Sequence, residues 1–153
     1  MTYRITGIDP EPYQRFFTMS DTDLTAANAV VMTSDARVGY PCRAALDDVP
    51  PETRLVLVNH VSHEGGPYAA SHAIFVSENA DRADYIDRVP PALDRRILSL
   101  RAFGADGMMA DACLAQRGEA DRAIRALFEN EAVDHIDAHN AIRGCFAARV
   151  ERA

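Results

Sequence analysis

The stretch RILSLRAFGADGMMADACLA, residues Arg96–Ala115, predicts a β-hairpin and, with it, the type of fold. Two β-type runs flank Ala105-Asp106-Gly107, which is typical of a type I turn whose glycine takes the left-handed position and forms a bulge. The register set by this loop places only apolar side chains on one face: Leu98, Leu100, Ala102, Ala110, Ala112 and Leu114. On the other face it places Arg101 opposite Asp111 and Ser99 opposite Cys113.

The segment HIDAHNAIRGCFAARVER, residues His135–Arg152, predicts a second hairpin with Ile142-Arg143-Gly144 as its loop. Its register gives an apolar face that consists of Ile136, Ala138, Phe146, Ala148 and Val150. The opposite face is polar and consists of His135, Asp137, His139, Cys145, Arg149 and Glu151. Asp137 is expected opposite Arg149 and His135 opposite Glu151, so the register forms complementary pairs.

An amphipathic helix is predicted between the hairpins, over Glu119–Glu129, because its apolar residues recur at helical spacing. It should lie on the apolar side of the four strands. Further short elements are predicted upstream: an edge strand over 3–8, helices over 11–17 and 21–28, and strands over 30–33, 54–61 and 71–77. Ser20 is the expected N-cap of the second helix. The pattern indicates an α+β fold around an antiparallel sheet, with a C-terminal hairpin–helix–hairpin unit and short N-terminal helices.

Length and composition are those of one ordinary globular domain, expected to span residues 1–153. The net charge of −7 and the scattered arginines disfavour a nucleic-acid partner or an anionic membrane surface. The N-terminus does not resemble a signal peptide, and no apolar run is long enough to span a membrane, so a cytoplasmic location is expected. Three cysteines without a CxxC pair predict free thiols.

Five segments also resemble a known family: GYPCRAAL, LVLVNHV, PYAASHAIFV, ILSLRAFGADGMMADA and HNAIRGCFAARV. In combination they are similar to a bacterial family of about the same length that is known only as a domain of unknown function. The resemblance covers nearly the whole chain. It implies a single-domain protein, and it implies no activity, cofactor or catalytic residue.

The triple His135, Asp137 and His139 is the weak candidate for a metal site, since alternate residues of a strand project from one face. Two imidazoles and a carboxylate at this spacing can share one ion and leave positions open for water or substrate. The expected pair between Asp137 and Arg149 argues against a metal, because a guanidinium competes for the carboxylate. A polar face without metal, either solvated or between elements of the fold, is the favoured interpretation of these residues, and a metal-free ligand pocket that uses the same side chains is the remaining one.

Two cysteines are candidates for chemistry together with His139. Cys145 shares a predicted face with His139 but lies diagonal to it, beyond comfortable hydrogen-bonding distance for a thiol and an imidazole. Cys42 lies in the turn-rich GYPCR stretch, where Arg43 could lower the pKa of its thiol. The alternative is that Cys42 fills the end of the sheet while Arg43 makes a surface pair.

Binding of a small polar or anionic molecule on the polar sheet face, beneath the loop around Cys42, is the predicted function. The ligand-binding residues would be Arg101, Asp111, His135, Asp137 and Arg149, with the two arginines holding the anionic group. One alternative is an interaction module or homodimer without a pocket. Another is a metal- or Cys/His-dependent enzyme. Whether other parts of the chain cover the polar face decides between a pocket and a solvated surface.

Overall fold

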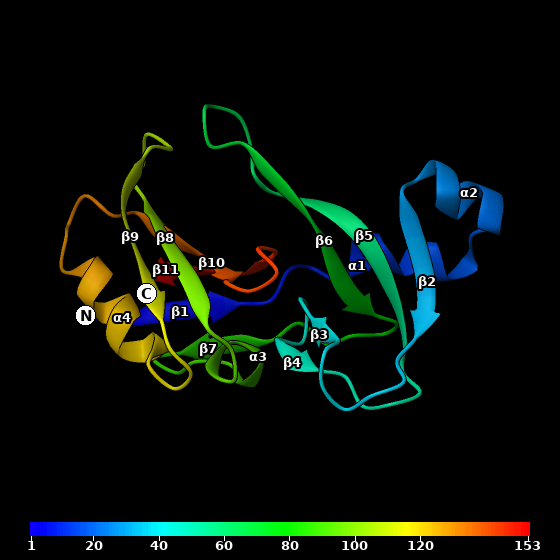
Figure 1. Ribbon diagram of the computed structural model, residues 1–153. Helices are drawn as coiled ribbons and strands as arrows, with labels where there is room; N and C mark the ends of the chain where they lie inside the picture. The colour runs from blue at the N-terminus through cyan, green and yellow to red at the C-terminus, as the bar shows by residue number, and fades with distance from the viewer.

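The chain folds into two β-sheets that face each other (Figure 1). Aromatic and polar side chains fill the space between them. The computed structural model describes residues 1–153. Sheet A is antiparallel, with its strands in the order β7 (Asp84–Ile86), β1 (Tyr3–Thr6), β11 (Phe146–Arg152), β10 (His135–Asn140), β8 (Leu98–Phe103) and β9 (Met109–Ala115).

Sheet B has five strands and is antiparallel except where β3 pairs with β6. Its strands follow the order β2 (Ala29–Thr33), β5 (Arg54–His63), β6 (Ala70–Ser77), β3 (Pro41–Cys42) and β4 (Asp47–Asp48). The long β5–β6 hairpin is the part of sheet B whose histidines contact sheet A.

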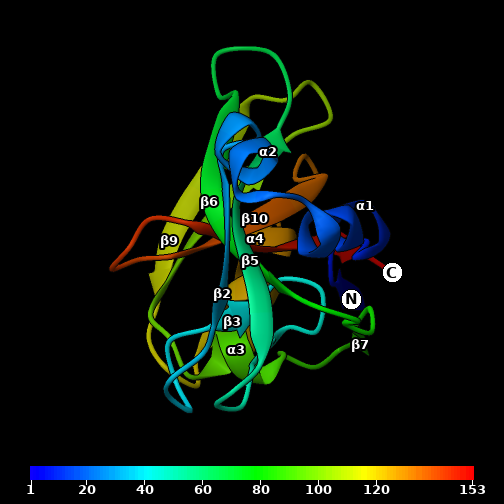
Figure 2. The ribbon, with the colours of Figure 1, turned by 90° about the vertical axis from the view of Figure 1, so that its right-hand side faces the viewer.

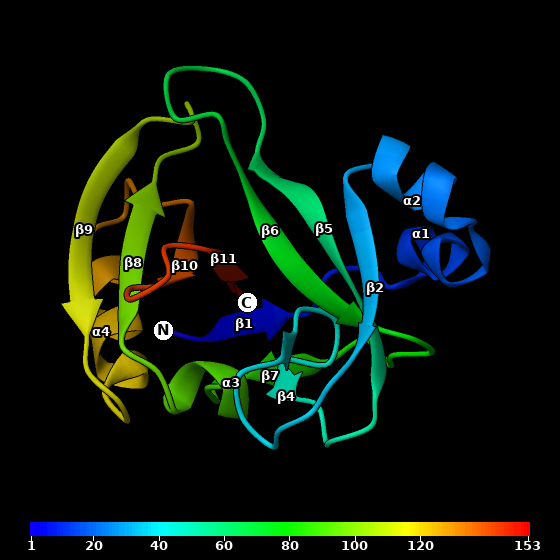
Figure 3. The same ribbon diagram turned by 45° about the vertical axis from the view of Figure 1, so that its right-hand side comes forward.

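Helix α4 (Ala120–Phe128) covers the apolar face of sheet A, on the side away from sheet B (Figures 1 and 3). Its Ile124 and Leu127 join Leu100 and Ile136 in one buried cluster. The amphipathic spacing of the helix explains this packing, because one stripe of its surface is apolar. The predicted hairpin–helix–hairpin unit is confirmed, and the fold is α+β and mostly β.

The remaining helices are short: α1 (Glu11–Gln14), the 3₁₀ helix η1 (Arg15–Thr18), α2 (Asp21–Ala26) and α3 (Pro91–Asp94). Ser20 caps α2 as predicted, since the backbone N–H of Asp23 donates to its Oγ at 3.2 Å. Helix α2 lies near the viewer beside sheet B in Figure 2. There Leu24 packs in a second buried cluster, with Phe16, Phe17 and Val58. No helix of the chain combines the length and the apolarity that crossing a membrane requires.

The register of the first hairpin departs from the prediction after one pair. Phe103 pairs with Met109 as the predicted register requires, but Ala102 then pairs with Asp111 because an extra residue is inserted in β9. The expected pair of Arg101 with Asp111 is therefore wrong, and Arg101 lies opposite Ala112. Asp111 shares its face with Ala102, at an exposed position, so it lies on the other side of the sheet from Arg101.

In the second hairpin the pairs of Asp137 with Arg149 and His135 with Glu151 are confirmed. A bulge near the turn then changes the facing of the residues beyond it, because His139 pairs with Phe146 and both Ala147 and Ala148 are buried on the apolar side. Phe146 consequently lies on the polar face, contrary to the prediction.

Two further differences concern β1 and the strand that pairs with it at the edge of sheet A, β7. Strand β1 lies inside sheet A, between β7 and β11, and is not an edge. The sequence does not indicate β7, since its three residues fall in an acidic stretch that is typical of a solvated loop.

Candidate functional site

All five histidines of the chain lie between the two sheets. His60 and His63 come from β5, His72 from β6, and His135 and His139 from β10. The ring centroids of His63 and His135 are 6.1 Å apart, and those of His72 and His139 are 5.1 Å apart. Sheet B therefore covers the polar face of sheet A, the face predicted to lie beneath the loop around Cys42.

A buried ion pair lies at the centre of this region. Asp137 is 1% exposed, and Arg149 donates to its carboxylate twice, from Nε to Oδ1 at 2.8 Å and from Nη2 to Oδ2 at 3.0 Å. The hydrogen bond to Asp137 raises the pKa of the Arg149 guanidinium, although burial acts in the opposite direction. Arg149 Nη2 also donates to the backbone oxygen of Ser62 at 2.8 Å, so the pair links sheet A to sheet B.

A β-bulge in β5 turns His63 toward Asp137. Val61 pairs with Ser71, but His63 pairs with Ala70, which leaves Ser62 as the extra residue. In a regular strand His63 would lie on the face opposite to His60, whereas the inserted residue returns it to the same face. The bulge also presents the carbonyl of Ser62 to Arg149.

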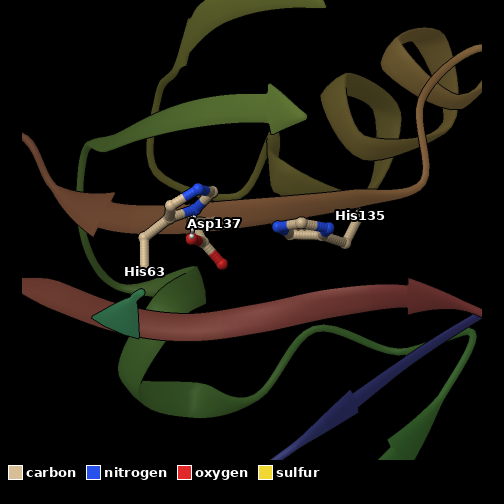
Figure 4. Close-up of side chains that lie close together, drawn as sticks. All are labelled: His63, His135 and Asp137. Atoms are coloured by element: carbon tan, nitrogen blue, oxygen red, sulfur yellow. Dashed lines mark ion pairs between the residues drawn. The ribbon is translucent and has the colours of Figure 1, made fainter. Parts of the chain in front are cut away.

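His63, His135 and Asp137 form a cluster in which one potential ligand atom of each lies within 4.8 Å of the other two (Figure 4). His63 Nδ1 is 3.8 Å from Asp137 Oδ2, which is beyond hydrogen-bonding distance. His63 Nδ1 and His135 Nε2 are both buried and have no hydrogen-bond partner. The other ring nitrogen of His135, Nδ1, is 2.9 Å from the carboxylate of Asp134.

The predicted metal triple therefore changes one member. His135 and Asp137 are together as expected, but His139 is turned toward His72, and its Nδ1 lies 3.3 Å from the backbone oxygen of Asp137. His63 takes the third place. Sequence spacing gives no signal for this, because His63 lies on another sheet and reaches the cluster only through the bulge in β5.

Burial disfavours the protonated form of three of the imidazoles. Burial is the largest cause of the low pKa of His139, which is about 4, and the positive charge of Arg101 lowers this pKa further. Burial also lowers the pKa of His60 and of His72. Neutral rings keep a lone pair on one nitrogen, which can accept a hydrogen bond or bind a metal.

A cleft of about 560 Å³ opens between the sheets beside this cluster. Its wall includes His60, His63 and His135 together with two arginines, Arg82 and Arg149. The acidic residues Glu64 and Glu151 also line it, as do the last residue of β1 and the two residues after it. The cleft is thus lined by charged groups of both signs and by three imidazoles.

Arg101 lies on the predicted face, opposite Asp137 on β10, with its guanidinium over the ring of Phe103. Phe103 packs against both His63 and His135, at centroid distances of 4.6 and 5.5 Å. Of the five predicted ligand-binding residues, the structure brings together Arg101, His135, Asp137 and Arg149. Asp111 is the one that lies elsewhere, on the far face of β9.

Neither candidate cysteine reaches His139. Cys145 lies opposite Asn140 and accepts a hydrogen bond from its side chain at 3.3 Å, so it is on the face away from His139. Cys42 is 1% exposed and packs in the core of sheet B, where Ser77 donates to its sulfur. The predicted surface pair of Arg43 is also wrong, because Arg43 is buried and donates to Cys145 Sγ at 3.1 Å.

A family model described as "Protein of unknown function (DUF1203)" matches residues 39–152. The chain belongs to the DUF1203 family. The matched part of this DUF1203 protein runs from just before β3 to the end of β11, so it includes every histidine and the pair of Asp137 with Arg149. No curated protein and no solved structure matches the chain. The family confirms the resemblance seen in the sequence, and it adds no activity.

Proposed function

We propose that this chain is a cytoplasmic protein that binds a small polar molecule carrying an anionic group, such as a carboxylate or a phosphate. The binding site is the cleft between sheets A and B. Its volume of about 560 Å³ lies within the range of small-molecule pockets in proteins, roughly 300–1,000 Å³.

Two anchored guanidiniums carry this proposal. Arg82 donates from Nε to the backbone oxygen of Gly7 at 2.7 Å, and Arg149 is anchored on Asp137 and Ser62. Both Nη groups of Arg82 and Nη1 of Arg149 have no hydrogen-bond partner within the protein, and both residues line the cleft. Positioned donors of this kind bind anionic oxygens with little loss of side-chain freedom.

The acidic residues of the wall narrow the class of ligand. Asp137 balances the charge of Arg149, while Glu64 and Glu151 line the same cleft. A simple anion would meet repulsion from these carboxylates. A molecule that carries hydrogen-bond donors in addition to one anionic group complements the whole wall better.

A thermal-shift screen with small carboxylates, phosphates and amino acids tests the proposal. A ligand present at about one hundred times its Kd should stabilise the folded state by roughly 2.7 kcal/mol and raise the melting temperature by roughly 5–10 °C. Arg82→Gln should then weaken binding by about ten- to a hundred-fold, because a hydrogen bond to a charged group is lost.

Arg37→Gln is the matched control, since Arg37 is exposed and lies outside the cleft. It should leave the affinity unchanged. Unchanged affinity in Arg82→Gln would place the ligand elsewhere and refute the proposal. The mass in solution, measured in the same preparation, tests the separate expectation of a homodimer.

A further inference from the structure

The geometry points to a binding site for one divalent transition-metal ion, held by His63, His135 and Asp137 on the wall of the cleft. The ligands would be one nitrogen from each imidazole and one carboxylate oxygen. This inference goes beyond the proposed function and does not depend on it, because a metal ion alone can occupy the cluster.

The first support is the state of the two imidazoles. The side chains of His63 and His135 are 10% and 13% exposed, yet His63 Nδ1 and His135 Nε2 have no partner. A buried polar atom without a partner costs about 1–3 kcal/mol, so such an atom in a native protein is usually satisfied by a bound water, an ion or another ligand. Here two of them lie around one carboxylate that is 1% exposed.

The second support comes from Asp134, a residue outside the cluster. Its carboxylate lies 2.9 Å from His135 Nδ1 and can only accept a hydrogen bond, so the tautomer with the proton on that nitrogen is favoured. The lone pair is then on Nε2, the atom directed at the cluster. Carboxylates hold metal-binding histidines in this way in many metal sites.

The third support is the rigidity of the ligands. His63 is directed into the cluster by the bulge at Ser62, and Phe103 packs against both imidazole rings. Asp137 is fixed by Arg149, which takes one lone pair on each carboxylate oxygen. Each oxygen has a second lone pair, so one remains available to a metal ion.

The donor set selects the class of metal. Two nitrogens and one oxygen suit Zn²⁺, Co²⁺, Ni²⁺ or Fe²⁺, whereas Mg²⁺ and Ca²⁺ prefer oxygen ligands. The positive charge of Arg149 beside Asp137 weakens the site relative to one with a free carboxylate. Because His63 and His135 line the cleft, the remaining coordination positions face it.

The test is a metal titration of tag-free protein. Metal is first removed with EDTA, and the protein is then exchanged into a buffer without phosphate or carboxylates, EDTA included. Zn²⁺ binding is followed by calorimetry and Co²⁺ binding by visible absorption. One ion should bind per chain, and Mg²⁺ should not compete. His63→Gln and His135→Gln should abolish stoichiometric binding. Asp134→Asn should weaken it by about 10–100-fold, and this variant keeps its fold, since the Asp134 side chain is 58% exposed.

His72→Gln is the matched control, because His72 lies between the same sheets and also has an unpartnered Nδ1, but is outside the cluster. It should bind metal like the wild type. The inference is overturned if the wild type binds neither ion stoichiometrically, if both histidine variants still bind, or if His72→Gln loses binding to the same extent. Since neither phosphate nor a carboxylate is present, a failure here leaves the proposed anion site untouched.

Discussion

Replacing Arg149 by methionine should destabilise the protein far more than neutralising its partner by Asp137→Asn. Methionine keeps the apolar stem of the side chain but removes the cation from a carboxylate that is 1% exposed. Breaking a buried ion pair in this way costs about 3–5 kcal/mol. The Arg149 side chain is 36% exposed in the native protein, so the lower end, about 3 kcal/mol, is expected.

The substitution Asp137→Asn should lower the free energy of unfolding less. The charge that remains is on Arg149, which reaches solvent and keeps its hydrogen bond to the Ser62 oxygen. The amide oxygen can still accept from the guanidinium, so one of the two hydrogen bonds between the side chains remains and the cost is about 1–1.5 kcal/mol. The double variant should be more stable than Arg149→Met alone, because neither charge is then left buried without a partner.

Urea denaturation in the presence of EDTA measures these differences without a contribution from metal binding. A gap of about 1.5–2 kcal/mol between the single variants corresponds to roughly 1 M in the urea midpoint at an m-value of about 2 kcal/mol per molar. If Asp137→Asn lowered the free energy of unfolding as much as Arg149→Met, the deeper burial of Asp137 would not determine the cost of breaking the pair, and the reasoning would be wrong.

Three further outcomes are expected. Burial lowers the pKa of His60 and His72, so on acidification the unfolded chain takes up protons before the folded protein does. The free energy of unfolding should therefore be constant above about pH 7 and fall as the pH drops below about 6.5. Equal urea midpoints at pH 7.5 and about pH 5.5 would contradict this. Gly7→Ala should cost at least about 2 kcal/mol of stability in urea, because the added Cβ would lie 1.8 Å from the backbone oxygen of Ala44. Cys42 should be the last of the three thiols to react with a thiol reagent under native conditions, since it is buried in the core, and rapid labelling would show that this core opens.

Local patterns in the sequence predict a large part of the fold. Alternation along 98–102 and 136–138 identifies the apolar face that α4 covers, and Asp137 pairs with Arg149 as predicted, although a bulge at Ala147 lies between this pair and the turn. These features depend on residues close together in the chain. The prediction holds because a slip in register would bring charged side chains into the core.

The errors arise where one inserted residue changes the facing of a strand. Bulges in β9 and β11 separate Asp111 from Arg101 and bring Phe146 to the polar face, and the bulge in β5 brings His63 to Asp137. A bulge changes the sequence pattern by a single residue, so alternation alone does not locate it. The docking of sheet B on sheet A is also beyond such patterns, because it joins residues far apart in the chain.

The placement of every histidine between the two sheets makes the imidazole protons a built-in spectroscopic reporter. In a proton NMR spectrum recorded in D₂O, the C2–H resonances of this chain arise from five rings that share one small region. A compound that enters that region should displace some of these signals without isotope labelling or an attached dye. A compound that associates with the outer surfaces should leave all of them in place. One spectrum therefore distinguishes compounds that bind between the sheets from compounds that bind elsewhere on the surface.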